Sequence, residues 1–386
     1  MEGHQPQPFS VARCHCLKKM SGGWPMFSQA TALPYFVLIL ILGLSWLPSL
    51  RESGLKPLLR AQGRQEPTIE NDEGKIPSRD TILTAKGVVT YAEIEENVYR
   101  PNNYRIVEPL FPLPKLDFIL RPSCSQIFED WLNITRSPPP AQPPKEIEQL
   151  DKDAFLLNGY SKLYEYAYLN EKASNRPVVW NQIDQMMKKA RVLVKSYGKD
   201  GDTVYYALRD HPVTNMTGFV IGSQKPWIEV QALRSGASKV YTVEYQETKI
   251  IGAANIEYIH PIDFAEKWKE NLEKFDFAIT FSSIEHSGLG RYGDPVDPIG
   301  DLREVQKVMC LLKKGGLFLV GIPRGLDGIL YNLHRIYGRI RLAMIMAGYE
   351  WVAMYRGNSP YPQCPRREDY EIVSGSKQEL YVLRKL

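Results

Sequence analysis

Residues 218–322 carry the feature that most constrains the fold. They contain two short apolar segments joined by a tight turn and a helical stretch. The first segment, GFVI, runs into Gly222, and the second, KVYTV, runs into Glu244. The glycine and the acid are about 20 residues apart, the spacing at which a carboxylate meets a ribose in nucleotide-binding units. The order strand, turn, helix, strand, acid therefore predicts a parallel α/β sheet with a ligand site at its edge.

The turn itself favours one class of ligand. A dinucleotide fingerprint needs three glycines so that the backbone can pack against a pyrophosphate, but here Gly222 stands alone and Pro226 follows, a residue suited to the first turn of a helix. S-adenosylmethionine has no phosphate and needs a close backbone approach, an acid for its ribose and a polar contact for adenine. We therefore predict this cofactor and the following residues to bind it: Gly222, Ser223, Glu244, Asp263 and Ser282.

Later segments extend the same sheet. Residues 275–281, FDFAITF, form an apolar run typical of a strand that is buried on both faces. A helix over 302–310, a Gly-Gly turn and a strand over 317–322 follow, and 349–355 and 379–383 have the pattern of two more strands. We predict a Rossmann-like sheet of seven mostly parallel strands with helices on both faces and one antiparallel strand near the end.

Three sequence stretches carry a family resemblance. VIGSQKPWIE, VEY and above all SSIEHSGLGRYGDPVDPIGD resemble the family catalogued as domain of unknown function 268, itself similar to class I S-adenosylmethionine-dependent methyltransferases. The resemblance covers roughly residues 145–386. It implies the class I methyltransferase fold and methyl transfer, with Gly222, Glu244 and Asp263 at the cofactor and Glu285 and His286 at the chemistry. The chain departs from better-known methyltransferases because it lacks a GxGxG loop.

The segment after residue 281 supplies the candidate catalytic side chains, because ligands of open parallel sheets sit beyond the carboxyl ends of the strands. We predict His286 as the base that removes a proton from an acceptor hydroxyl and Glu285 as its orienting partner or a substrate ligand. In the loop that follows, Asp301 is expected to cap the next helix, and no metal site is predicted. The loop residues expected to grip sugar hydroxyls are Arg291, Tyr292 and Asp294.

The N-terminal part contains a candidate membrane anchor. Residues 30–50 carry no charge, and about 20 residues cross a hydrocarbon core of about 30 Å. Tyr35 and Trp46 lie near the ends of this span, as interfacial aromatic residues do. A cleaved signal peptide is the alternative, but the long preceding segment and the absence of a clear cleavage site favour an anchor. We predict a short tail over 1–29 and a signal-anchor helix over 30–50.

Basic residues lie on both sides of the span, so their distribution does not decide its orientation. Two glycosylation sequons, at Asn133 and Asn215, would place the C-terminal part in the lumen if they are used. A tail, an anchor, a stem and a distal enzyme domain resemble the layout of Golgi glycan enzymes. We expect a single-pass type II Golgi membrane protein with a luminal catalytic domain and a glycan or glycoprotein acceptor.

The middle of the chain is predicted to hold the domain away from the membrane. Residues 51–144 are polar and then proline-rich, which indicates a stem and linker, and residues 145–386 form the methyltransferase-like domain. Helical spacing over 146–171 and 178–197 predicts two helices before the first strand. The five cysteines suggest no framework, so we assign no disulfide. A net charge of +4, spread along the chain, gives no basic face for nucleic acid.

Two other functions remain open at this point. A Golgi glycosyltransferase would hold a nucleotide-sugar metal with an Asp-x-Asp after an apolar strand, but Asp151-Lys152-Asp153 and Asp200-Gly201-Asp202 do not follow such strands. A catalytically inactive methyltransferase-like binding module is supported by the single glycine of the turn. We favour an O-methyltransferase of the secretory pathway that acts on a sugar hydroxyl, with fucose or mannose as candidate acceptors.

Overall fold

The structure is a computed structural model that describes residues 80–137, 142–174, 176–373 and 377–386. The predicted tail over 1–29, the anchor over 30–50 and the stem up to residue 79 lie outside the described residues. In the part of the chain that is described, no helix is long and apolar enough to span a bilayer.

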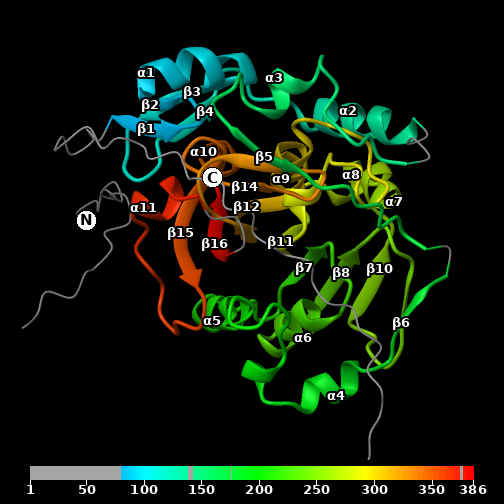
Figure 1. Cartoon of the computed structure of the whole chain (residues 1–386). Coiled ribbons are helices and arrows are strands. Elements are labelled where there is room, and N and C mark those ends of the chain that lie inside the picture. Colours follow the sequence, from blue (N-terminus) through cyan, green and yellow to red (C-terminus); the bar gives the residue numbers. More distant parts are fainter. Residues whose placement is uncertain (1–79, 138–141, 175, 374–376) are drawn as a thin grey trace, which may run out of the picture. The chain divides into compact units, whose positions relative to one another are not determined.

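A seven-stranded sheet forms the centre of the described chain (Figure 1). Its strands lie in the order β10-β8-β7-β11-β12-β16-β15, and β7, β8, β10, β11 and β12 are mutually parallel. β16 runs antiparallel to both of its neighbours, β12 and β15. The predicted α/β sheet with one antiparallel strand is confirmed. Its strands are β7 (Thr217–Ile221), β8 (Lys239–Val243), β10 (Ile256–Ile259), β11 (Phe275–Phe281), β12 (Leu312–Pro323), β15 (Tyr349–Arg356) and β16 (Gln378–Lys385).

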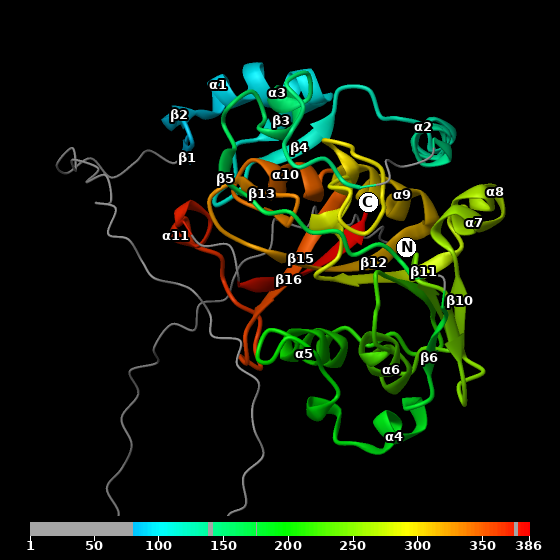
Figure 2. The same cartoon turned by 45° about the vertical axis from the view of Figure 1, so that its right-hand side comes forward.

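Helices cover both faces of this sheet (Figures 1 and 2). α5 (Asp202–Asp210) and α6 (Trp227–Arg234) lie on one face, and α7 (Pro261–Glu266), α9 (Gly300–Leu311) and α10 (Arg341–Met346) lie on the other. β11 is the central strand, and its apolar side chains must be buried by helices on both faces of the sheet. Phe277 and Ile279 belong to the core beneath α5 and α6, whereas Phe275 and Ala278 belong to the core on the opposite face. The apolar run at residues 275–281 therefore corresponds to a strand that is buried on both faces of the sheet.

The N-terminal segment folds with the domain, although we predicted a stem over 51–144. Residues 80–136 contribute Tyr99, Phe118 and Phe128 to the same buried core as α9 and α10. Arg339, which is fully buried, donates hydrogen bonds to the Pro112 carbonyl oxygen and other acceptors of this segment. Its elements are β1 (Thr81–Thr84), β2 (Gly87–Thr90), α1 (Tyr91–Ile94), η1 (Glu95–Tyr99), η2 (Arg100–Asn102), β3 (Tyr104–Glu108), β4 (Lys115–Phe118) and α2 (Cys124–Arg136).

The two helices predicted over 146–171 and 178–197 are wrong. Leu157, Asn158 and Gly159 have positive φ angles, which end a helix, and Leu193 is 65% exposed instead of lying on a buried face. The segment forms short elements that wrap around the sheet domain. They are α3 (Lys152–Phe155), β5 (Lys162–Tyr166), β6 (Val178–Trp180), α4 (Ile183–Lys188) and η3 (Arg191–Leu193). The remaining elements are β9 (Thr248–Ile250), α8 (Trp268–Asn271), η4 (Ile284–His286), β13 (Gly328–Tyr331), β14 (His334–Ile336) and α11 (Glu368–Glu371).

Asp301 does not cap α9, as we expected from the sequence. It lies in the first turn of the helix, is fully buried, and accepts hydrogen bonds from Arg341 and from the Tyr337 hydroxyl. Burial alone would raise the pKa of Asp301, but the charges of Arg335 and Arg341 lower it to about 2. The carboxylate therefore ties α9 to α10 as part of a buried ion cluster.

A disulfide joins α2 to α9, so our assignment of no disulfide was wrong. Cys124 and Cys310 are bonded, with their Cα atoms 5.8 Å apart. The two cysteines are 186 residues apart in the sequence, and only the docking of the N-terminal segment brings them together. The bond fixes α2 on the face of the sheet domain that α9 covers.

Removing this disulfide is expected to destabilise the protein. The bond closes a long loop, so Cys124→Ser should lower the free energy of unfolding by roughly 2–5 kcal/mol, measured by denaturant unfolding. Cys310→Ser and the double variant should be destabilised by the same amount, because all three lose the same bond. An additive loss in the double variant would contradict the assigned pairing.

Candidate functional site

A cavity of about 970 Å³ opens at the edge of the sheet where the parallel strands end. This volume lies near the upper end of the range of about 300–1,000 Å³ that is usual for ligand pockets. The turns after β7, β8 and β11 contribute to its wall, as do the loop before α9 and the start of β16. The predicted residues that line it are Gly222, Ser223, Glu244, Ser282, Glu285, His286, Arg291, Tyr292 and Asp294.

The turn after β7 is built around Gly222. Its φ is +73°, and a Cβ atom at this position would lie 1.8 Å from the Ser283 hydroxyl oxygen. No residue other than glycine therefore fits without moving the turn after β11. The Gly222 N–H donates to the Val243 carbonyl, which joins the turns after β7 and β8. The single glycine in the sequence marks the point where three turns meet.

A buried carboxyl group, that of Glu229, stabilises this turn through a hydrogen bond. Glu229 of α6 is fully buried and accepts one hydrogen bond from the Ser223 hydroxyl and another from the Thr242 hydroxyl. Burial raises the pKa of Glu229 to about 7. Ser223 was predicted to bind the cofactor, but its hydroxyl is engaged with Glu229 and the Lys225 carbonyl. Ser223 still lines the cavity.

Glu244 lies directly after β8, where the sequence predicted it. Its Oε1 atom accepts hydrogen bonds from the backbone N–H groups of Tyr245 and Gln246, which orients the carboxylate, and burial raises its pKa. Tyr245 lines the cavity beside it and offers an aromatic surface. Asp263 is exposed on α7 and is not among the residues that line the cavity, although its neighbour Phe264 is. The structure therefore does not bring Asp263 together with the other predicted residues.

Glu285 is the most deeply buried acid of the cavity wall. Its side chain is 1% exposed, and Oε1 accepts a hydrogen bond of 3.0 Å from the Gln378 side-chain amide. Its Oε2 atom has no hydrogen-bond partner among the residues that the structure describes. Burial raises the pKa of Glu285 to about 7. The carboxyl group can therefore exchange a proton near neutral pH.

His286 is oriented by the backbone and not by Glu285. Its Nδ1 atom lies 2.6 Å from the Leu333 carbonyl oxygen, which can only accept, so Nδ1 carries the hydrogen and Nε2 is the free acceptor of the neutral ring. Nε2 is 4.0 Å from Glu285 Oε1, too far for a hydrogen bond. Burial and the nearby Arg291 lower the pKa of His286 to about 3. The imidazole therefore stays neutral at physiological pH.

The loop between η4 and α9 surrounds these two residues. Arg291 lines the cavity, forms an ion pair of 2.9 Å with Glu171 and lies over the ring of Tyr292. Tyr292 packs edge-to-face against His286, with ring centroids 5.5 Å apart. Asp294 behaves differently from the prediction, because its carboxylate accepts four backbone N–H bonds of the loop, from Gly288, Leu289, Gly290 and Tyr292. It shapes the loop and has little capacity left to bind a sugar.

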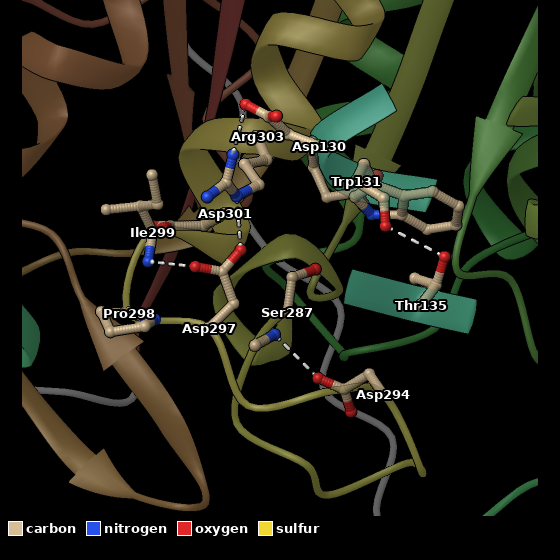
Figure 3. A network of polar contacts seen from close by, with 12 residues as sticks. Asp130, Trp131, Thr135, Ser287, Asp294, Asp297, Pro298, Ile299, Asp301 and Arg303 are labelled. Carbon is tan, nitrogen blue, oxygen red and sulfur yellow. Dashed lines mark hydrogen bonds and ion pairs between the residues drawn. The ribbon is translucent and has the colours of Figure 1, made fainter. Parts of the chain in front are cut away.

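Figure 3 shows how the end of this loop is anchored. Asp297 accepts hydrogen bonds from the Ile299 N–H and from Arg303, so it is also occupied. Trp131 of α2, also drawn in Figure 3, accepts a hydrogen bond from the Thr135 hydroxyl through its backbone carbonyl, and its indole N–H donates to Glu304. In the described ranges, no group of three or more His, Cys, Asp or Glu side chains is placed to hold a metal ion.

Sequence reasoning missed three contributions to the cavity. Gln378 is the first residue of β16, and Asp200 lies before α5; both line the cavity. α2 adds Phe128, Trp131 and Ile134, which we had placed in the stem. Nothing local in the sequence marks Gln378.

The other motifs singled out in the sequence are the two sequons and the two Asp-x-Asp segments. Asn133 is exposed on α2, and Asn215 is exposed in the turn before β7 with a φ of +60°. Of the two Asp-x-Asp motifs, the first overlaps α3 and does not line the cavity. The second leads into α5, where Asp202 is buried and paired with Lys195.

One family model matches part of the chain. Residues 215–386 match the family model described as Caenorhabditis protein of unknown function, DUF268, which confirms the resemblance over that part of the chain. No curated protein matches.

Solved structures resemble the domain weakly. The 1,6-didemethyltoxoflavin-N1-methyltransferase of Burkholderia thailandensis, with S-adenosylhomocysteine bound, is 16% identical with a TM-score of 0.34, covering 47% of this chain and 76% of its own. The N-methyltransferase NodS of Bradyrhizobium japonicum, also with S-adenosylhomocysteine, is 8% identical with a TM-score of 0.32, covering 53% and 97%. An S-adenosylmethionine-dependent methyltransferase of Mesorhizobium loti is 18% identical with a TM-score of 0.31, covering 49% and 100%. The fold is assigned from the strand order of the sheet and not from these matches.

The tight contact at Gly222 leads to a prediction about stability. Gly222→Ala places a Cβ against Ser283, whereas Gly315→Ala, at a similar φ of +79°, meets nothing within 4 Å. Both variants carry the cost of a left-handed alanine, but Gly222→Ala should lose roughly 1–3 kcal/mol more in free energy of unfolding because of the clash. Adding Ser283→Gly should recover most of that difference. Equal destabilisation of the two alanine variants would show that the contact is not tight.

Proposed function

We propose that this chain is an S-adenosylmethionine-dependent O-methyltransferase that methylates a sugar hydroxyl on glycans of the secretory pathway. One observation carries the proposal. A single cavity at the carboxyl edge of the sheet unites the turn at Gly222 and the acid Glu244 with the buried pair Glu285 and His286. Fucose and mannose are the acceptors to examine first.

The residues of one end of the cavity fit the cofactor. The turn at Gly222 lines the cavity where the methionine part would bind, and Glu244 is positioned for the ribose hydroxyls. Tyr245, beside Glu244, provides a surface for an adenine ring. When bound, the cofactor supplies an electrophilic methyl group on a sulfonium. The residues after β11 then face the acceptor.

Glu285 and His286 have different roles in the proposed reaction. Glu285 has a pKa of about 7, whereas that of His286 is about 3, so the carboxylate is the stronger base near neutral pH. Oε2 of Glu285 has no partner within the described chain and belongs to a residue that lines the cavity. We therefore assign proton removal to Glu285, in place of His286. The Nε2 atom of His286, held by the bond between Nδ1 and Leu333, accepts a hydrogen bond that positions the acceptor.

The proposed location is the Golgi lumen, with residues 30–50 as the single type II anchor. Disulfides form and persist in oxidising compartments and are rare in the cytosol, and Cys124–Cys310 joins two helices of the domain. Both sequons expose their asparagines, so neither is blocked by the fold. These two observations support a luminal domain, independently of the anchor itself.

Activity should depend on the protonation of Glu285. The carboxylate is the active form, so kcat/KM for methyl transfer should fall as the pH drops through about 7 and level off above it. Glu285→Gln, which cannot accept the proton, should lower kcat by about 10²–10⁴-fold. His286→Asn should lower it less and leave the acid limb in place.

The measurement uses full-length enzyme, S-adenosylmethionine with a labelled methyl group, and glycoprotein from cells that lack the gene. Mass spectrometry of released glycans identifies the methylated sugar. An acid limb near pH 3 would assign the base to His286 instead. Transfer that persists unchanged in Glu285→Gln would remove this carboxyl group from the chemistry.

The topology predicts N-glycosylation of the full-length protein. Treatment with peptide-N-glycosidase should increase its mobility, because Asn133 and Asn215 both reach the oligosaccharide-transferring machinery in a luminal domain. Asn133→Gln and Asn215→Gln should each remove part of the shift and the double variant all of it. A wild-type protein that carries no glycan at either site would contradict the luminal orientation.

A further inference from the structure

Two buried acceptor atoms of the cavity wall lack partners in the described part of the chain. They are Oε2 of Glu285 and the side-chain carbonyl oxygen Oε1 of Gln378. The residues are 1% and 9% exposed, and both line the cavity. A buried acceptor without a hydrogen bond is costly, and such atoms in native proteins are uncommon. A ligand that brings donors to this place would satisfy both.

The orientation of the Gln378 amide is determined by its neighbours. Its Nε2 atom donates to Glu285 Oε1 at 3.0 Å and to the Ser282 hydroxyl oxygen at 3.1 Å. An ionised carboxylate accepts only, so the amide must present its nitrogen to Glu285. The amide oxygen is therefore left without a partner in the described part of the chain, as is Oε2 of Glu285. The two residues form a rigid pair joined by one hydrogen bond.

The fold holds this pair at the reactive edge of the sheet. β16 runs antiparallel to β12, and its first residue, Gln378, pairs with Pro323 at the end of β12. Its backbone N–H also donates to Asp200 at 3.3 Å. Because an antiparallel strand begins where its parallel neighbours end, Gln378 lies at the same edge as Ser282 and Glu285. The backbone position of Gln378 is thus set by its pairing with β12.

We propose that Glu285 and Gln378 together recognise two neighbouring hydroxyl groups of the acceptor, so that the substrate is a vicinal diol of a sugar. The inference rests on the proposed function and deepens it. The hydroxyl at Glu285 is the one that is methylated, and the adjacent hydroxyl donates its hydrogen bond to the Gln378 carbonyl oxygen. Gln378 is therefore a positioning residue that selects the acceptor.

The chemical step balances with these groups. The hydroxyl oxygen forms a bond to the methyl carbon as its O–H proton passes to Glu285, and the bond between that carbon and the sulfonium sulfur breaks. The electron pair of the broken bond stays on sulfur, which becomes a neutral thioether. The products are a methyl ether, S-adenosylhomocysteine and a protonated Glu285. The second hydroxyl is unchanged and keeps its bond to Gln378.

The same two acceptor atoms would also suit an ammonium group, such as that of the cofactor's amino acid part. Both ligands share the chemistry of adjacent hydrogen-bond donors. They differ in which binding event depends on Gln378: the sugar in the first case and S-adenosylhomocysteine in the second. The experiment therefore measures both.

The test uses full-length protein saturated with S-adenosylhomocysteine. The probes are the methyl glycosides of fucose and mannose and their 3-deoxy analogues, which have no vicinal hydroxyl pair. Affinities come from ligand-observed NMR titration, and S-adenosylhomocysteine binding from calorimetry. The wild type should bind at least one parent glycoside about tenfold more tightly than its 3-deoxy analogue, the effect of one lost hydrogen bond in a buried site.

Gln378→Met keeps the length of the side chain and removes the amide. This variant should lose the preference for the diol and retain its affinity for S-adenosylhomocysteine. Gln363→Met is the matched control, because Gln363 bonds to Ser359 and Tyr361 and does not line the cavity. It should keep the preference of the wild type. If Gln378→Met does not fold, the comparison of the parent glycosides with their 3-deoxy analogues on the wild type still decides whether the protein recognises a vicinal diol.

The outcomes separate this inference from the proposed function. Binding of S-adenosylhomocysteine without any preference for the diol overturns the inference and leaves methyl transfer standing. A loss of S-adenosylhomocysteine affinity in Gln378→Met, with the sugar preference intact, assigns the pair to the cofactor and also overturns it. Absence of S-adenosylhomocysteine binding to the wild type removes the proposed function itself.

Discussion

The contact between Gly222 and Ser283 is the constraint on which the cavity depends. It joins the turns after the two central strands at a distance that only a glycine permits. Glu229 holds the first of these turns through Ser223 and also bonds to Thr242 of the neighbouring strand. A fully buried carboxyl group with two hydroxyl donors therefore supports the turn without a glycine-rich loop. The site owes its shape to this support and not to a longer glycine motif.

Burial shifts the pKa values of Glu285 and His286, which follow β11, in opposite directions. Removal from water disfavours the charged form of each, which raises the pKa of Glu285 and lowers that of His286. The nearby Arg291 lowers the pKa of the imidazole further. The result is a carboxyl group that titrates near neutrality beside a ring that stays neutral. One environment thus shifts the two pKa values in opposite directions, although both residues follow the same strand.

The N-terminal segment belongs to the same physical unit as the sheet. Its α2 helix contributes to the wall of the cavity and is held to α9 by the Cys124–Cys310 bond and by the group of Trp131, Glu304 and Lys307. Lys307 is buried beneath the Trp131 ring at 3.5 Å. A domain that began at residue 145 would therefore lack one side of its own ligand site.

The sequence alone determined the central sheet and the order of its turns, because apolar runs and the spacing from Gly222 to Glu244 are local patterns with a direct physical cause. It also predicted that Glu285 and His286 lie at the edge of this sheet, because they follow closely after the strand that ends at Phe281. Only the tertiary structure decided the roles of Gln378, Asp294 and Cys124, since each depends on a partner distant in the chain or on the detailed course of a loop. Polar and proline-rich composition suggested a stem and linker over 51–144, but in residues 80–136 the contacts with Arg339 and the core outweigh that local tendency. Pairing between distant residues leaves no local pattern, and for that reason it could not be predicted.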